Sequence, residues 1–107
     1  MRCRRCSPLP EQVARTADLL GRRWSLQIIY AASQSGACRF NEFRQVLVGI
    51  PPRTLAQRLV DLEQAGVLER TVVDARPPRV EYHLTGSGGR LAQVMDALQA
   101  WSVHDGR

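Results

Sequence analysis

The sequence predicts one mainly α-helical domain that carries a single β-hairpin. Apolar residues recur at helical spacing in five segments, whereas they alternate with other residues in two short runs between positions 68 and 84. With 107 residues, the chain is long enough for one domain with a modest core and too short for two. We expect residues 1–10 to form a flexible arm rich in Arg and Cys, and residues 11–107 to form the domain.

Two helices are expected at the start of the domain, over residues 11–20 and 23–33. Their apolar stripes recur every three or four residues, at Val13, Ala17 and Leu20 and then at Trp24, Ile28 and Ala31. Gly21 lies between the two stripes. We expect it to adopt the left-handed conformation that ends many helices.

A short third helix and a longer fourth helix are expected over residues 41–66. Asn41 is a candidate cap for the first turn of the third helix, and Gly49 is expected to close that helix. Pro51 and Pro52 suit the first turn of the fourth helix, where a missing N–H has no partner within the helix. Gly66 is expected to close the fourth helix.

The pattern changes from helical to alternating after Gly66. Residues 68–72 and 80–84 read as the two strands of a hairpin, and DARPPR between them predicts a stiff, basic tip. Thr85 is a candidate cap for a last helix. The apolar stripe of this helix, the longest in the chain, consists of Leu91, Val94, Met95, Leu98 and Trp101. A short helix, a turn, a longer helix and a hairpin form the layout of a winged helix-turn-helix.

The fourth helix has a polar face that folding does not require. Leu55, Leu59 and Leu62 fall within a narrow arc suited to the core. The opposite side carries Arg53, Thr54, Gln57, Arg58 and Asp61. Most amphipathic helices simply present such a face to water, but Arg, Gln and Thr are also the residue types that contact base edges in the major groove. Because this helix follows a short helix and a turn, we favour DNA recognition.

The hairpin offers a second point of contact with DNA. Two arginines flank the paired prolines of its tip, where they are expected to reach phosphates or the minor groove. The predicted DNA-binding residues are therefore Arg53, Thr54, Gln57, Arg58, Arg76 and Arg79.

The charge of the chain agrees with a nucleic-acid partner. There are 15 basic and 10 acidic residues, the net charge is +5, and every basic residue is Arg. No apolar run approaches the roughly 18 residues that cross a bilayer, and the N-terminal segment has no apolar stretch typical of a secretory signal. We expect a cytoplasmic protein with no membrane partner.

Three linked motifs resemble the HxlR-type branch of the MarR-like winged helix-turn-helix transcriptional regulators, which are small dimeric bacterial proteins. They are LLGRRWSLQII, RFNEFRQVLVGIPPRTLAQRLVDLEQAGVLER and PPRVEYHLTGSGG, within residues 11–101. The resemblance implies a homodimer built from the first and last helices, with the fourth helix reading DNA and the hairpin as its wing. The expected interface residues are Val13, Leu20, Leu91, Val94, Leu98 and Trp101. The family often has a redox-sensitive Cys where this chain has Glu11.

The cysteine spacing favours an arm without a chemical role over a redox sensor, and a redox sensor over a metal site. Cys3 and Cys6 have the spacing of half a zinc site or of a redox pair, and the neighbouring arginines favour thiolates. A zinc site would need Cys38, His83 or His104 at no recognisable spacing, so we expect no metal. Cys38 is expected in a loop or strand near the core.

The sequence carries no motif of a catalytic or cofactor site, so we expect neither an enzyme nor a bound cofactor. The leading hypothesis is a sequence-specific regulator, acting as a repressor on a pseudo-palindromic operator. Its input would be a small apolar ligand near Trp24 and Trp101, which we favour slightly, or oxidation of Cys3 and Cys6. The alternative is a winged-helix interaction module that binds a protein, or nucleic acid without sequence preference.

Overall fold

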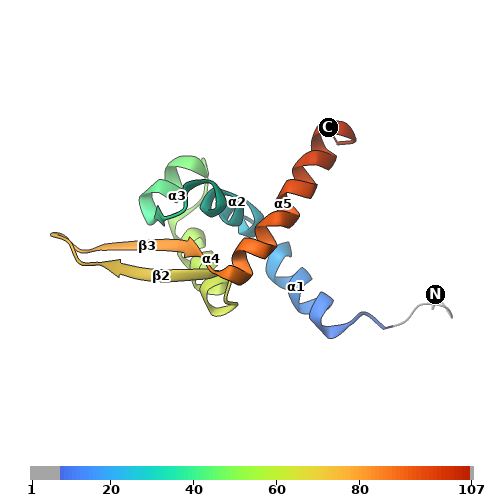
Figure 1. The fold of residues 1–107 in the computed structure, drawn as a ribbon, viewed down its shortest axis with the longest axis horizontal. Coiled ribbons are helices and arrows are strands. Elements are labelled where there is room, and N and C mark those ends of the chain that lie inside the picture. The colour runs from blue at the N-terminus through green and yellow to red at the C-terminus, as the bar shows by residue number, and fades with distance from the viewer. Residues whose placement is uncertain (1–7, 107) are drawn as a thin grey trace.

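The computed structural model describes residues 8–106 as five helices around a small antiparallel sheet (Figure 1). In chain order, the elements are α1 (Glu11–Gly21), α2 (Ser25–Ser35), β1 (Cys38–Arg39), α3 (Phe40–Val46), α4 (Pro52–Gln64), β2 (Leu68–Val73), β3 (Arg79–Leu84) and α5 (Gly86–His104). The predicted order of four helices, a hairpin and a last helix is confirmed.

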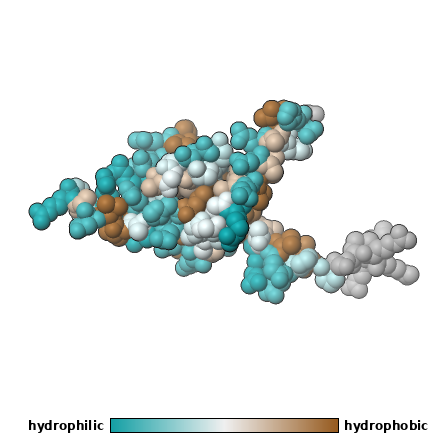
Figure 2. Space-filling model, in the orientation of Figure 1, coloured by the Kyte–Doolittle hydropathy of each residue, from teal (hydrophilic) through white to brown (hydrophobic). Residues whose placement is uncertain are grey.

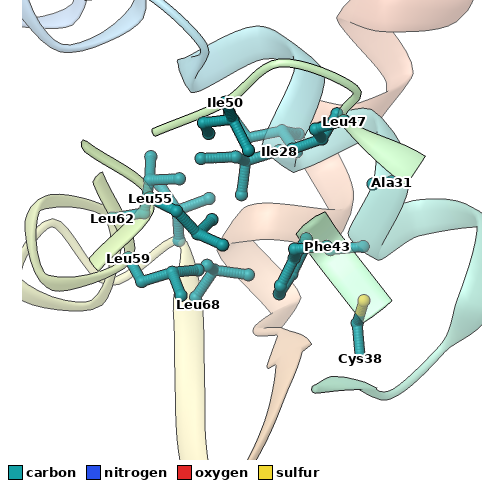
Figure 3. Packing of buried hydrophobic residues seen from close by; sticks show 13 residues of the cluster. Ile28, Ala31, Cys38, Phe43, Leu47, Ile50, Leu55, Leu59, Leu62 and Leu68 are labelled. Atoms are coloured by element: carbon teal, nitrogen blue, oxygen red, sulfur yellow. The ribbon is translucent and has the colours of Figure 1, made fainter. Parts of the chain in front are cut away.

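The core lies where α2, α3 and α4 meet the start of β2 (Figure 3). Ile28 and Phe43 are completely buried, and the predicted apolar edge of α4 is confirmed because Leu55, Leu59 and Leu62 are each at most 1% exposed. Burying a side chain of this size contributes about 1.5–3 kcal/mol. Three leucines on one edge therefore fix which face of α4 remains outside.

The sheet contains a strand that the sequence pattern did not predict. Its order is β1-β3-β2, and β1 pairs with the inner strand at Cys38 and Tyr82. With only two residues, β1 is too short to show an alternating pattern. In the predicted hairpin, Leu68 lies opposite Leu84 and Arg70 lies opposite Tyr82, so the two alternating runs face the same side of the sheet.

The corner between α1 and α2 differs from the prediction. Gly21 is the last residue of α1 and is not left-handed; the left-handed residue is Trp24, with φ of 79°. Helix α2 accordingly begins at Ser25 rather than at residue 23. The guanidinium of Arg23 lies 5.4 Å from the centre of the Trp24 ring, a geometry that favours a cation–π interaction. Tertiary packing of this corner thus overrides the preference for glycine.

The third helix also begins differently. Asn41 is not its cap, because α3 starts at Phe40 and the N–H of Arg39 donates to Oε1 of Glu42 at 2.8 Å. A glutamate three residues after the cap position satisfies a donor that no helical carbonyl reaches. The helix ends at Val46, so Gly49 (φ 91°) belongs to the following turn.

Helix α5 begins as the sequence predicts. The hydroxyl of Thr85 accepts a hydrogen bond from the N–H of Gly88 at 2.9 Å, which caps the first turn. The same hydroxyl donates to the carbonyl of Gly66, the glycine that follows α4 with φ of 77°. The start of α5 is therefore fastened to the end of α4.

Helix α1 and the distal part of α5 project from the body of the domain and diverge from each other (Figure 1). No residue of α1 is buried, and Gly88 is the only buried residue of α5. Brown, apolar surface lies on α1 and near the end of α5 (Figure 2). These two helices thus form arms that carry apolar side chains away from their own core.

Candidate nucleic-acid interface

The helix-turn-helix consists of α3, a turn over residues 47–51 and α4. Leu47 and Ile50 in the turn are 7% and 6% exposed, so the turn is anchored in the core. Gly49 supplies the left-handed residue that a tight turn requires, and Pro52 opens α4. The side chains that follow Pro52 are consequently presented from a rigid support.

The predicted DNA-reading residues of α4 differ in their exposure. Arg53 and Gln57 are exposed, whereas Thr54 and Arg58 are half-buried. Arg53 takes part in no side-chain hydrogen bond or ion pair with residues 8–106. Thr54 lines a cavity of about 330 Å³ together with Trp24 and Gly49. Arg53 therefore presents the free guanidinium of this face.

The carboxylate of Asp61 contacts three polar side chains, two from α4 and one from the corner between α1 and α2. Its Oδ1 accepts a hydrogen bond from Nε2 of Gln57 at 2.9 Å. Its Oδ2 lies 2.9 Å from a terminal nitrogen of Arg22 and 3.2 Å from one of Arg58. The carboxylate is only 10% exposed, so these ion pairs are more shielded from water than ordinary surface pairs.

The environment of Asp61 lowers the pKa of its carboxyl group below the ordinary value. Burial acts in the opposite direction, since it disfavours the charged form. The hydrogen bond from Gln57 and the guanidinium groups of Arg22 and Arg58 outweigh that effect. Asp61 is accordingly an ionised, acceptor-only group at neutral pH.

Arg58 lies in a different setting from Arg53. Its Nε donates to the carbonyl oxygen of Arg23 at 3.0 Å, and a terminal nitrogen donates to Asp61. Its side chain is 21% exposed. The structure thus directs this predicted base-reading residue toward the corner between α1 and α2.

The two predicted wing arginines lie in different places. Arg76 is exposed in the loop between the strands, whereas Arg79 is the first residue of β3 and lies opposite Val73. Arg79 also lines a cavity of about 420 Å³ with Asn41 and Gln45 of α3. Of the two arginines that flank the prolines, Arg76 therefore lies in the loop itself, and Arg79 lies at the adjoining end of β3, beside α3.

Polar residues of α3 form a part of this surface that sequence reasoning missed. Asn41, Arg44 and Gln45 are exposed and line a cavity of about 560 Å³ that reaches Gly49. The pattern that could have revealed them is their position on α3, on either side of the buried Phe43 and before the buried Leu47. They lie directly before the turn that leads into α4.

The six predicted interface residues separate into two groups. Leu20 and Leu91 are half-buried and pack against the core of their own chain. The exposed members are Val13, Val94, Leu98 and Trp101, with exposed fractions of 50%, 46%, 41% and 59%. The exposed group offers the larger apolar surface for contacts with a second chain.

The candidate sensor residues are only partly placed by the structure. Cys3 and Cys6 lie outside the described residues 8–106. Cys38 is confirmed as a strand residue near the core; it is 3% exposed, and burial raises the pKa of its thiol. That shift disfavours the reactive thiolate.

One cavity with a mainly apolar lining lies away from the predicted ligand position near Trp24 and Trp101. A cavity of about 480 Å³ opens between α2, α3 and α5, and its lining includes Leu26, Tyr30, Val46 and Met95. Among residues 8–106, no cluster of three or more His, Cys, Asp or Glu side chains is arranged to hold a metal ion. Over the same range, no helix is both long and apolar enough to cross a membrane.

The fold and the exposed face of α4 define a winged helix-turn-helix protein, and the chain belongs to the HxlR-like helix-turn-helix family, whose model matches residues 19–106. The predicted resemblance is thus confirmed. Members of this family are transcriptional regulators rather than enzymes, and this protein is a helix-turn-helix transcriptional regulator.

Individual relatives agree with this assignment. The HTH-type transcriptional regulator YodB of Bacillus subtilis is 39% identical over 85 residues, which cover 79% of this chain and 75% of YodB. The structure of reduced YodB superimposes with a TM-score of 0.79 at 35% identity, covering 89% of this chain and 92% of that one. The redox regulator HypR in its oxidised form gives a TM-score of 0.80 at 34% identity, covering 88% and 96%.

Proposed function

We propose that this regulator is a homodimeric repressor that binds a pseudo-palindromic operator in double-stranded DNA. The observation that carries the proposal is the outward polar face of α4, where Arg53 is free and the leucines of the opposite edge are buried. Repression follows if the operator overlaps a promoter, because the bound protein then excludes RNA polymerase. The protein would act in the cytoplasm, where bacterial DNA lies.

The DNA contacts divide into base reading and backbone contacts. Arg53, Thr54 and Gln57 would enter the major groove, where Arg pairs with guanine and Gln with adenine. Arg76 in the hairpin loop would reach phosphates or the adjacent minor groove. Arg79, together with the polar residues of α3, would hold the backbone beside the recognition helix.

Dimerisation is supported by the arms and by the geometry of DNA. A palindromic operator presents two major-groove faces about 34 Å apart that each receive a recognition helix, whereas one chain supplies a single helix-turn-helix within residues 8–106. The exposed apolar residues of α1 and α5 supply a surface that a two-fold partner would cover.

Two inputs remain for the switch, and a separate observation supports each. The relatives YodB and HypR have been solved in forms described by their redox state, which supports oxidation of Cys3 and Cys6. The apolar cavity beside Met95 supports a small ligand, because it lies at the base of the α5 arm. Either input would act by altering the spacing of the two recognition helices.

A gel shift with DNA from upstream of its own gene tests the proposal. Saturable binding that depends on both halves of a palindrome is expected. Equal affinity for unrelated duplexes would instead support the alternative of an interaction module without sequence preference. The salt concentration must be held constant, because counterion release strongly affects affinity.

The switch is tested by adding diamide to the protein–operator complex. In this reaction two thiols become a disulfide, and diamide takes up the two electrons and two protons. Release of the wild type but not of a Cys3→Ser/Cys6→Ser variant would identify the thiols as the switch. A Cys38→Ala variant is the control and should respond as the wild type does. Release of all three proteins would exclude Cys3 and Cys6.

A further inference from the structure

The carboxylate of Asp61 constrains the chemistry that Gln57 can offer to DNA. A side-chain amide has a carbonyl oxygen that accepts and an NH₂ group that donates, and either end can face a neighbour. An ionised carboxylate accepts only, so it must receive the NH₂ end of Gln57, as the 2.9 Å contact from Nε2 to Oδ1 shows. Asp61 therefore prevents the amide of Gln57 from turning over.

An amide held in this way presents a defined pattern. Its carbonyl oxygen and its second N–H remain available to a base in the major groove. Adenine offers the complement, a donating N6 amino group beside the accepting N7. A turned amide would put a donor where the amino group needs an acceptor. Holding the amide thus favours adenine and also avoids the entropy cost of ordering the side chain at the moment of binding.

The second oxygen of Asp61 is held from outside α4. Oδ2 contacts Arg22, which belongs to the corner between α1 and α2, and also Arg58. Arg58 in turn donates to the carbonyl oxygen of Arg23, 35 residues away in the sequence. The recognition helix and the base of the α1 arm are therefore joined twice: a side chain of the corner contacts α4, and a side chain of α4 contacts the main chain of the corner.

These contacts give Arg58 a different role from that of the residues proposed to read bases. Its guanidinium already serves two acceptors, one on α4 and one on the main chain of the corner. Turning it toward a base would leave Asp61, which is only 10% exposed, with fewer donors. An ionised group that is buried without its partners is costly.

We propose that Asp61 is a positioning residue that fixes the amide of Gln57 for recognition of an adenine, and that Arg22 and Arg58 hold Asp61 in place. Arg22 and Arg58 together form what we call the Asp61 clamp, and Arg58 then does not read a base. This inference rests on the proposed function, since it assigns a role within sequence-specific DNA binding.

The test begins with an operator selected from random duplexes by the wild-type full-length protein, followed by affinities for every single-base change. Gln57→Ala identifies the base pair that Gln57 reads. Asp61→Asn is the decisive variant, because its own amide oxygen would face the two arginines and its NH₂ would face Gln57, which reverses the Gln57 amide. We expect the preference for adenine at that position to fall by about fivefold.

Glu63→Gln is the matched control. It removes one negative charge from an exposed site on the same helix, two residues from Asp61. Both variants should strengthen nonspecific binding equally, because each removes one negative charge. A difference between them in the preference for adenine at the base pair read by Gln57 is therefore due to the position of the Gln57 amide and not to charge. In the Gln57→Ala background, Asp61→Asn should cause no further loss of preference there.

A second variant covers the case in which Asp61→Asn impairs folding. Arg22→Gln removes one of the two ion pairs that hold Asp61 and leaves Asp61 and Gln57 unaltered. It should reduce the preference for adenine at the Gln57 position by less than Asp61→Asn does. Arg58→Ala should lower the melting temperature and, like Arg22→Gln, relax the preference for adenine at the Gln57 position without changing the preference at any other position.

The outcomes are distinct. If Asp61→Asn and Glu63→Gln show the same base preferences, or if Asp61→Asn only weakens all sequences equally, the positioning role is wrong. A loss of preference at a separate operator position in Arg58→Ala would show that Arg58 reads a base. If the wild-type selection returns no preferred sequence, the proposed function itself fails.

Discussion

Gly88 in α5 lies directly against the main-chain carbonyl oxygen of Val67, at a distance that leaves no room for a β-carbon. The N–H of Thr85 donates to that same carbonyl at 3.1 Å. The end of α4, the start of the hairpin and the start of α5 therefore meet at one point. Because the neighbouring atom is main chain, it cannot move aside as a flexible side chain would.

We expect Gly88→Ala to destabilise the fold by about 1–3 kcal/mol, the usual cost of overpacking. Gly89→Ala is the matched control, since open space surrounds that position. Alanine within a helix is better than glycine by about 0.5–1 kcal/mol, so the control should be slightly stabilising. Urea unfolding of both variants measures the difference, and equal stabilities would contradict the close packing.

Arg53→Ala should lower operator affinity by about 1–3 kcal/mol and relax the preference at one base pair. The physical reason is that its guanidinium lies near the start of α4 and makes no side-chain hydrogen bond or ion pair within residues 8–106 that would hold it away from a base. Arg15→Ala removes the same charge from the exposed surface of α1 and should preserve the base preference. Quantitative gel shifts with single-base operator variants make the comparison. Unchanged base preferences in Arg53→Ala would show that Arg53 does not contact a base edge.

The wing is expected to contribute to affinity without contributing to base preference. Replacing Arg76 and Arg79 with alanine should weaken all sequences alike and reduce the slope of log affinity against log salt by about one unit per lost phosphate contact. Arg15→Ala/Arg90→Ala carries the same change in net charge away from the hairpin. If both double variants retain the wild-type slope, the wing does not touch phosphates.

Leu98→Glu should weaken the dimer by about 2 kcal/mol or more, because a charge would be buried at a central apolar contact. Val48→Glu is the control, since Val48 is 83% exposed in the turn before α4 and lies outside both arms. Sedimentation velocity at micromolar concentration compares the two. A wild-type protein that is monomeric and binds its operator as one copy would refute the dimer.

Asp61 should make part of the stability depend on pH. Its pKa in the folded state is lowered by Gln57, Arg22 and Arg58 against the effect of burial, and in the unfolded chain it returns to about 3.9. The contribution is therefore complete above about pH 4 and is lost as the pH falls through the folded-state pKa. The unfolding free energies of the wild type and Asp61→Asn should converge on acidification, whereas Glu63→Gln should follow the wild type throughout.

Much of the architecture could be predicted because it depends on local patterns. The leucine edge of α4, the cap at Thr85 and the left-handed Gly66 each follow from spacing or from residue type at a helix end. The corner at Trp24 could not be predicted, because an aromatic residue adopts a left-handed conformation only where the surrounding packing requires it.

The sequence by itself determined the class of fold, the order of the elements and the helix that presents an exposed polar face, since helical and strand periodicities are properties of neighbouring residues. Only the tertiary structure decided how that face is divided. Arg53 and Arg58 are the same residue type on one helix, yet one is free and the other is bound to the carbonyl of Arg23, 35 positions earlier. The physical reason is that a hydrogen bond or an ion pair needs a partner in space, and distant partners meet only when the chain has folded.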